Sequence, residues 1–151
     1  MALLVPNLGE IALLNKMLGT VTASTQMFLG LYSENVTPIE ATVYTDVDNL
    51  DTNTGGNWGN RGYAPVKLTG ANWTVADVGA GVVRGTYNSA VNFVFGDGTI
   101  LNPVQTYIDV YGYTIVNEDS VLLWAERFTD GPYRIPAGGG TITITPRIEL
   151  D

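Results

Sequence analysis

Near the start of the chain, apolar residues recur at helical spacing. The residues of this stripe are Leu8, Ile11, Leu14 and Leu18. Steps of three and four residues place them on one face of an α-helix. Asn7 precedes the stripe where an N-cap belongs, and Gly19 follows it where a left-handed C-cap belongs. The pattern therefore predicts one amphipathic helix over residues 8–18.

After this segment the pattern changes to an alternation of apolar and polar residues. Short runs rich in Thr, Val, Tyr and Ile are separated by Gly, Asn, Asp and Pro, which is typical of β-strands joined by turns. The predicted strands cover residues 26–33, 40–46, 63–68, 73–75, 82–87, 91–95, 105–116, 120–128 and 141–150. Residues 48–60 are rich in Asn, Asp and Gly, and they predict a long exposed loop.

The last predicted strand has the clearest alternation. Ile142, Ile144, Ile148 and Leu150 share one face, but Pro146 interrupts the run. Proline has no backbone N–H to donate to a neighbouring strand. This strand is therefore predicted to lie at a sheet edge or to begin a new pairing at Pro146.

Together these elements predict a single domain spanning residues 1–151. The predicted fold is mainly β, with one N-terminal α-helix at about residues 8–18 and a β domain at about residues 21–150. Several short strands with turn signals between them favour an antiparallel β-sandwich or jelly roll, or a distorted barrel. The order of strands in the sheets stays open.

Composition narrows the function classes. The chain has neither Cys nor His and carries a net charge of −8, so catalysis by Ser-His-Asp or Cys-His groups is excluded. The negative charge opposes binding to nucleic acid, and no apolar run reaches the ~20 residues of a membrane-spanning helix. The start of the chain lacks the basic region of a signal peptide. We expect a non-enzymatic protein, made in a cytoplasm, without cofactor, nucleic-acid or membrane partners.

One group of acidic residues has the chemistry of a metal site. Asp46, Asp48 and Asp51 lie close together in the sequence, and clustered carboxylates are ligands for Ca²⁺. Their spacing does not match the loop of an EF-hand, however, and a solvated turn explains them better. They are weak metal candidates, and no metal site is predicted.

Several acidic and aromatic residues have both a structural and a functional interpretation. Adjacent acids such as Glu118 and Asp119 fit a hairpin turn better than a pair of catalytic carboxylates. Aromatic residues fit a core, a subunit interface or a sugar-stacking platform. The candidate interface residues are Leu8, Ile11, Leu14, Trp58, Tyr63, Trp124, Arg127, Ile144 and Ile148.

Several segments resemble small virion proteins of tailed bacteriophages, including phages of cyanobacteria. They are Leu-Val-Pro-Asn-Leu-Gly-Glu at 4–10, Leu-Tyr-Ser-Glu-Asn-Val-Thr-Pro at 31–38, Gly-Tyr-Ala at 62–64, Tyr-Gly-Tyr at 111–113, Trp-Ala-Glu-Arg-Phe at 124–128 and Ile-Thr-Ile-Thr-Pro-Arg-Ile-Glu-Leu at 142–150. The resemblance implies a capsid decoration or cement protein that stabilises the assembled head. It also implies a virion location, a homo-oligomer, with a trimer favoured, and the major capsid protein as partner.

Two other functions fit the same sequence. A tail, neck or fibre component of the virion has a similar composition but is present in few copies. A carbohydrate- or receptor-binding module is suggested by the three Trp, the eight Tyr and the loop at 48–60. Copy number and glycan binding distinguish these alternatives from a decoration protein.

Overall fold

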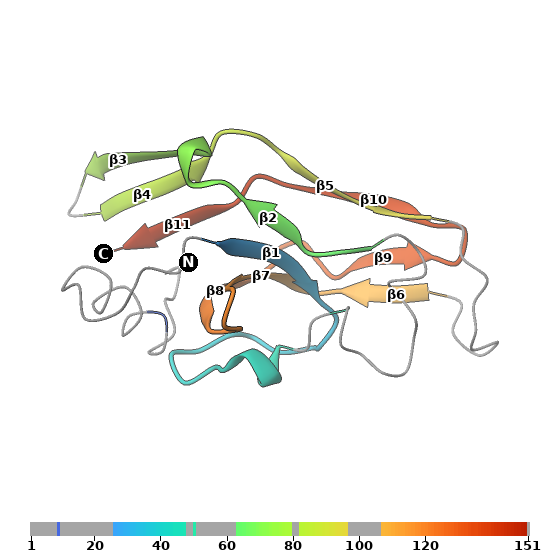
Figure 1. Ribbon diagram of the computed structural model, residues 1–151. Coiled ribbons are helices and arrows are strands. Elements are labelled where there is room, and N and C mark those ends of the chain that lie inside the picture. Colours follow the sequence, from blue (N-terminus) through green and yellow to red (C-terminus); the bar gives the residue numbers. More distant parts are fainter. Residues whose placement is uncertain are drawn as a thin grey trace.

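The computed structural model describes Gly9 and residues 26–47, 50, 63–79, 82–96 and 107–150. This part of the chain is mainly β, and its strands pair antiparallel in sheets that do not close into a barrel. The elements are β1 (Met27–Tyr32), η1 (Tyr44–Asp46), β2 (Val66–Leu68), η3 (Gly70–Asn72), β3 (Trp73–Gly79), β4 (Val82–Tyr87), β5 (Val91–Phe95), β6 (Tyr107–Val110), β7 (Gly112–Asn117), β8 (Leu122–Arg127), β9 (Tyr133–Pro136), β10 (Gly140–Ile144) and β11 (Arg147–Leu150) (Figure 1).

Two long, bent β-ribbons organise the described residues. In the first, β6 and β7 follow each other and pair with β9 and β8, while β1 and β2 extend the sheet in the order β2-β1-β7-β8. In the second, β4 and β5 follow each other and pair with β11 and β10. Each ribbon changes direction where its pairing is interrupted, and β3 adds a third strand beside β4.

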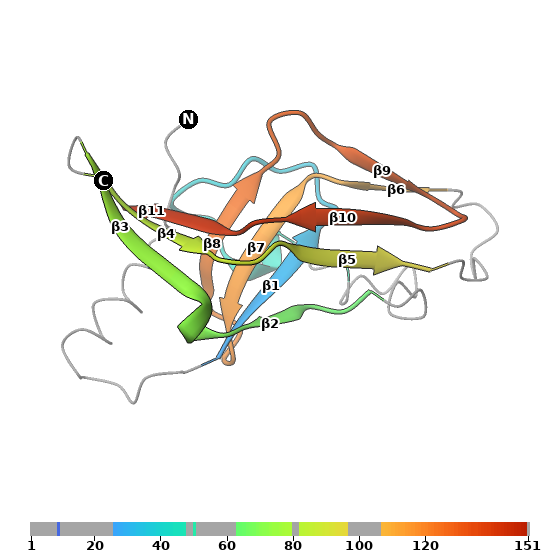
Figure 2. The same ribbon diagram turned by 90° about the horizontal axis from the view of Figure 1, so that it is seen from above.

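The two ribbons form a sandwich-like arrangement. Seen from above, β5 and β10 cross over β7 and β1 (Figure 2), and in the side view they lie above the β2-β1-β7-β8 sheet. Gly139 lies in the turn between β9 and β10, which leads the chain from one ribbon to the other. Its φ of 87° and a would-be Cβ only 2.2 Å from the Phe95 carbonyl oxygen require glycine there.

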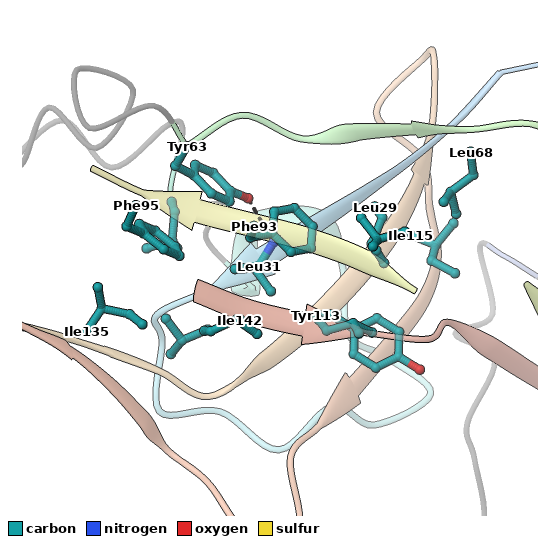
Figure 3. Close-up of a cluster of buried hydrophobic side chains, with 14 of the residues drawn as sticks. Leu29, Leu31, Tyr63, Leu68, Phe93, Phe95, Tyr113, Ile115, Ile135 and Ile142 are labelled. Atoms are coloured by element: carbon teal, nitrogen blue, oxygen red, sulfur yellow. Dashed lines mark hydrogen bonds between the residues drawn. The ribbon is translucent and has the colours of Figure 1, made fainter. Parts of the chain in front are cut away.

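The main core fills the space between these layers (Figure 3). Inward-facing residues of β5, Phe93 and Phe95, stack on the Tyr63 ring at centroid distances of 5.7 and 5.5 Å. The Tyr63 hydroxyl accepts a 2.8 Å hydrogen bond from the buried backbone N–H of Leu31. Full burial of an apolar side chain of this size contributes about 1.5–3 kcal/mol. The inward-facing side chains of β5 therefore contribute much of the stabilisation between the layers.

Several strand predictions are confirmed. The predicted ranges 82–87 and 91–95 coincide with β4 and β5, and the hairpin across residues 118–119 joins β7 to β8. The prediction about Pro146 is also confirmed, because β10 pairs with β5 before it and β11 pairs with β4 after it. β11 is an edge strand of its three-stranded sheet.

Other strand predictions are wrong. Residues 40–46 form a turn and η1, and β9 was not predicted. The predicted strand 105–116 is divided at Tyr111, because Gly112 begins a separate pairing with both neighbours of β7. The helix predicted at residues 8–18 lies outside the described residues except for Gly9, as does most of the predicted loop 48–60. Within the described residues, no helix is long and apolar enough to cross a membrane.

Candidate interaction surface

The sheet β11-β4-β3 packs on the core through Tyr87, Trp73 and Ile148 and continues as an exposed apolar surface. Its register places Val75 beside Gly85 and Ile148, and Asp77 beside Val83. Directly opposed residues of antiparallel strands share a face. Val75 is 69% exposed and Val83 is 42% exposed, so this face carries large apolar side chains in contact with solvent.

The outer strand of this sheet has a free edge. In the described part of the chain, β3 pairs with β4 alone, and its residues after Trp73 are exposed. Trp73 anchors the start of β3, since its ring meets Tyr87 edge-on at 5.3 Å. Asp77 accepts a hydrogen bond from the Gly79 N–H where the strand ends. An edge of this length offers backbone donors and acceptors to a further strand.

A polar cavity of about 430 Å³ lies on the opposite face of the same sheet. The residues that line it come from four strands and one link, and they are Arg84, Thr86, Tyr113, Glu126, Thr145 and Arg147. Tyr113 donates a 2.5 Å hydrogen bond to Glu126. Burial, followed by that bond, raises the pKa of Tyr113, so the phenol stays protonated and holds the carboxylate in place.

The two arginines of the cavity differ in their partners. Arg84 is ion-paired with Glu149 across the β4–β11 ladder. Arg147 is exposed, and within the described residues its guanidinium has no hydrogen bond, ion pair or ring contact. The cavity therefore contains one guanidinium that the fold itself does not use.

Arg127, a predicted interface residue, contacts its own fold. Its guanidinium donates to the carbonyl oxygen of Val36 at 2.9 Å and to the side-chain oxygen of Asn35 at 2.8 Å. It also lies over the ring of Tyr111 at 4.8 Å. The Tyr32 hydroxyl donates to Val36 at 3.4 Å, and burial raises the pKa of that phenol. Arg127 and Tyr32 thus fix the loop that follows β1.

The remaining predicted interface residues divide into three groups. Trp124, Tyr63 and Ile144 are 0%, 2% and 7% exposed and belong to the core cluster, Trp124 from β8, Ile144 from β10 and Tyr63 from the segment before β2. Ile148 is half-buried against that core. The others, which lie outside the described residues, are Leu8, Ile11, Leu14 and Trp58.

The aromatic platform considered for sugars is not assembled by the described residues. Trp124, Tyr63 and Tyr87 are buried, so their faces are not available to a ring in solution. The exposed aromatics lie elsewhere, on β6 and β9: Tyr107 is 42% exposed, and Arg134 lies 3.7 Å from its ring centroid. Arg134 also pairs through two hydrogen bonds of 2.8 and 3.0 Å with Asp109.

The acidic candidates for a metal site are not brought together by the described structure. Asp46 is exposed and accepts a 2.9 Å hydrogen bond from the Val43 N–H, which begins η1. Asp48 and Asp51 lie outside the described residues. In the described ranges, no group of three potential ligands of the His, Cys, Asp or Glu type occurs.

Sequence reasoning missed both the exposed β11-β4-β3 sheet and the cavity. The sequence signal for the sheet lies in residues 73–79, where Val75 and Val78, on either side of Ala76 and Asp77, are both exposed. No signal for the cavity exists at the level of local pattern, because Arg84 and Arg147 come together only through the β4–β11 register.

In comparisons with known proteins, no family model matches the chain, and no curated protein matches it significantly.

Proposed function

We propose that this chain is a non-enzymatic virion structural protein, a capsid decoration protein that oligomerises, as a trimer, and stabilises the assembled phage head. The observation that carries the proposal is the β11-β4-β3 sheet, whose outer strand β3 has a free edge among the described residues and whose apolar side chains Val75 and Val83 are exposed. Exposed apolar surface beside a free strand edge favours association with a partner. The sequence resemblance to virion proteins names that partner as the major capsid protein.

The chemistry of the described residues is compatible with this role. Apart from Arg147, the titratable groups that line the cavity make structural bonds, Tyr113 with Glu126 and Arg84 with Glu149. A decoration protein needs a rigid fold and contact surfaces but no reactive group. The net charge of −8 opposes non-specific binding of such a subunit to nucleic acid.

The first test measures two quantities for the wild-type protein. Light scattering after size exclusion gives the mass in solution, and quantitative mass spectrometry gives the copy number in purified particles of the phage that encodes the chain. A trimer present at hundreds of copies supports capsid decoration. A handful of copies supports the alternative of a tail, neck or fibre component, and absence from particles refutes a virion role.

A pair of valine substitutions tests the surface itself. Val75→Glu places a charge on the exposed face of β3, whereas Val94→Glu places one on β5, where the side chain is 58% exposed. Burying a valine contributes about 1.5–3 kcal/mol, so we expect Val75→Glu to weaken association at least about tenfold. Val94→Glu serves as the matched control and is expected to assemble like wild type. Equal assembly by both variants would exclude this face.

A further inference from the structure

The outer edge of β11 has backbone groups that point away from its own sheet. The Tyr87 N–H donates to the Pro146 carbonyl at 2.9 Å, and the register then places Ile148 opposite Gly85. Inward and outward backbone groups alternate along an antiparallel strand. The N–H and C=O of Ile148 therefore point toward β4, whereas those of Arg147 and Glu149 point outward.

These outward groups lie beside the polar cavity. The Tyr113 hydroxyl is 3.4 Å from the carbonyl oxygen of Arg147, which places the open edge of β11 directly against the cavity wall. Within the described residues, no hydrogen bond is made by the N–H groups of Arg147 and Glu149. An open edge next to a cavity is the arrangement in which an added strand pairs with the edge and places a side chain in the cavity.

The arginine without a partner indicates the chemistry of that side chain. Arg84 is ion-paired with Glu149, whereas Glu126 keeps its charge as it accepts from the neutral Tyr113 phenol. Among the described residues, Arg147 is the cavity guanidinium that no acceptor engages. Three of the four arginines in the described residues are held by partners of the fold, namely Arg84, Arg127 and Arg134. A free guanidinium beside the Thr86 and Thr145 hydroxyls fits a carboxylate, which accepts hydrogen bonds from both kinds of group.

We propose that the β11 edge binds an extended segment of a partner protein, which pairs with Glu149 and places an acidic side chain in the cavity against Arg147. A free sugar fits less well, because the described wall of the cavity has Tyr113 as its aromatic residue and that ring is buried. The inference adds a partner chemistry to the proposed assembly role and rests on it, but its test uses a peptide and needs no virion.

The test is a titration of the full-length, ¹⁵N-labelled protein followed by NMR. The probe is the peptide acetyl-Thr-Val-Glu-Val-Thr-amide, and its counterpart has Gln in place of Glu. We expect amide shifts at Arg147 and Glu149 and a shift of the Arg147 side chain. The Gln peptide is expected to bind about tenfold more weakly because it lacks the negative charge that pairs with Arg147. Binding of the Glu peptide is expected to weaken as salt is raised.

Two variants and one small molecule sharpen the test. Arg147→Gln is expected to reduce affinity for the Glu peptide to that for the Gln peptide, whereas Arg134→Gln, the same change on β9, is expected to leave it unchanged. N-acetylglutamate amide supplies the carboxylate without a strand. If it binds as tightly as the peptide, strand pairing at β11 is refuted.

Other outcomes also overturn the inference. They are the absence of shifts at β11 up to millimolar peptide, equal binding of the Glu and Gln peptides, or shifts confined to the edge of β3. If one of these results is found while the wild-type protein still oligomerises and decorates particles, the β11 site is refuted and the proposed function stands. If the peptide binds at β11 but the protein is absent from particles, the β11 site stands and the proposed function is refuted.

Discussion

Replacing Gly112 by alanine is expected to disrupt the central sheet. Gly112 begins β7, where it faces Tyr32 of β1 on one side and Arg127 of β8 on the other. A Cβ at this position would lie 2.0 Å from the Glu126 carbonyl oxygen and 2.5 Å from the Tyr32 ring. Contacts between carbon and a carbonyl oxygen are normally about 3.3 Å or longer, so the backbone of β8 would have to move by more than ~1 Å.

The size of the effect follows from what that movement breaks. The atom nearest the new methyl group belongs to the backbone of β8, which the β7–β8 ladder holds in register. Overpacking in a core costs about 1–3 kcal/mol, and a clash with backbone on one side and a buried ring on the other is expected at the upper end. For a chain of this size about 3 kcal/mol lowers the melting temperature by ~10 °C.

Gly85→Ala is the matched control. Its Cβ would meet its nearest atom, in the Trp73 ring, at 3.6 Å, which is ordinary van der Waals contact. Removing a glycine from an unstrained strand position stabilises a protein by about 0.4–1 kcal/mol through the unfolded state. Calorimetry and urea unfolding of the two variants check the comparison. A Gly112→Ala protein as stable as Gly85→Ala would refute the argument from close approach.

Two further predictions concern charged side chains. The Arg134 hydrogen bonds lower the pKa of Asp109 from its usual 3.8. The pair therefore stabilises the fold at pH values above 3.8, and this stabilisation is lost as the pH falls through the lowered pKa. The urea midpoints of wild type and Arg134→Gln should therefore differ near neutral pH and converge in acid. Arg127→Gln removes the guanidinium that holds Asn35 and Val36, and we expect a loss of about 1 kcal/mol with faster proteolysis after β1; unchanged cleavage would show that the loop is held by other contacts.

The strands that the sequence predicted well are those whose inward face is continuous. Along β5, Val91, Phe93 and Phe95 are buried while Asn92 and Val94 are exposed, so the residues of one parity form the buried face. Val94 of β5 and Val83 of β4 are nevertheless apolar and exposed. Local pattern identifies a strand in both cases, but it does not distinguish a core-facing valine from one on an open face.

The errors have local physical causes. Residues 40–46 alternate like a strand, yet the Thr42 hydroxyl accepts from the Ile39 N–H and Asp46 accepts from the Val43 N–H. Such side-chain bonds to nearby backbone compete with sheet pairing. β9 was missed because of its residues only Ile135 is buried, and Pro136 ends it. Its pairing with β6 instead depends on contacts such as Arg134 with Asp109, which join residues far apart in the sequence.

The interruptions in the predicted strands locate the proposed interaction surface. Up to Ile144 the second ribbon follows the core, with β10 paired to β5; after Pro146 it diverges, with β11 paired to β4. Pro146 still accepts from Tyr87, so the ladder continues across the bend, and beyond it Ile148 is half-buried against the core while Arg147 is exposed. Pro146 therefore separates the β5–β10 half of the ribbon, which packs in the core, from the β4–β11 half. The sheet of that second half presents Val75 and Val83 on one face and Arg147 on the other.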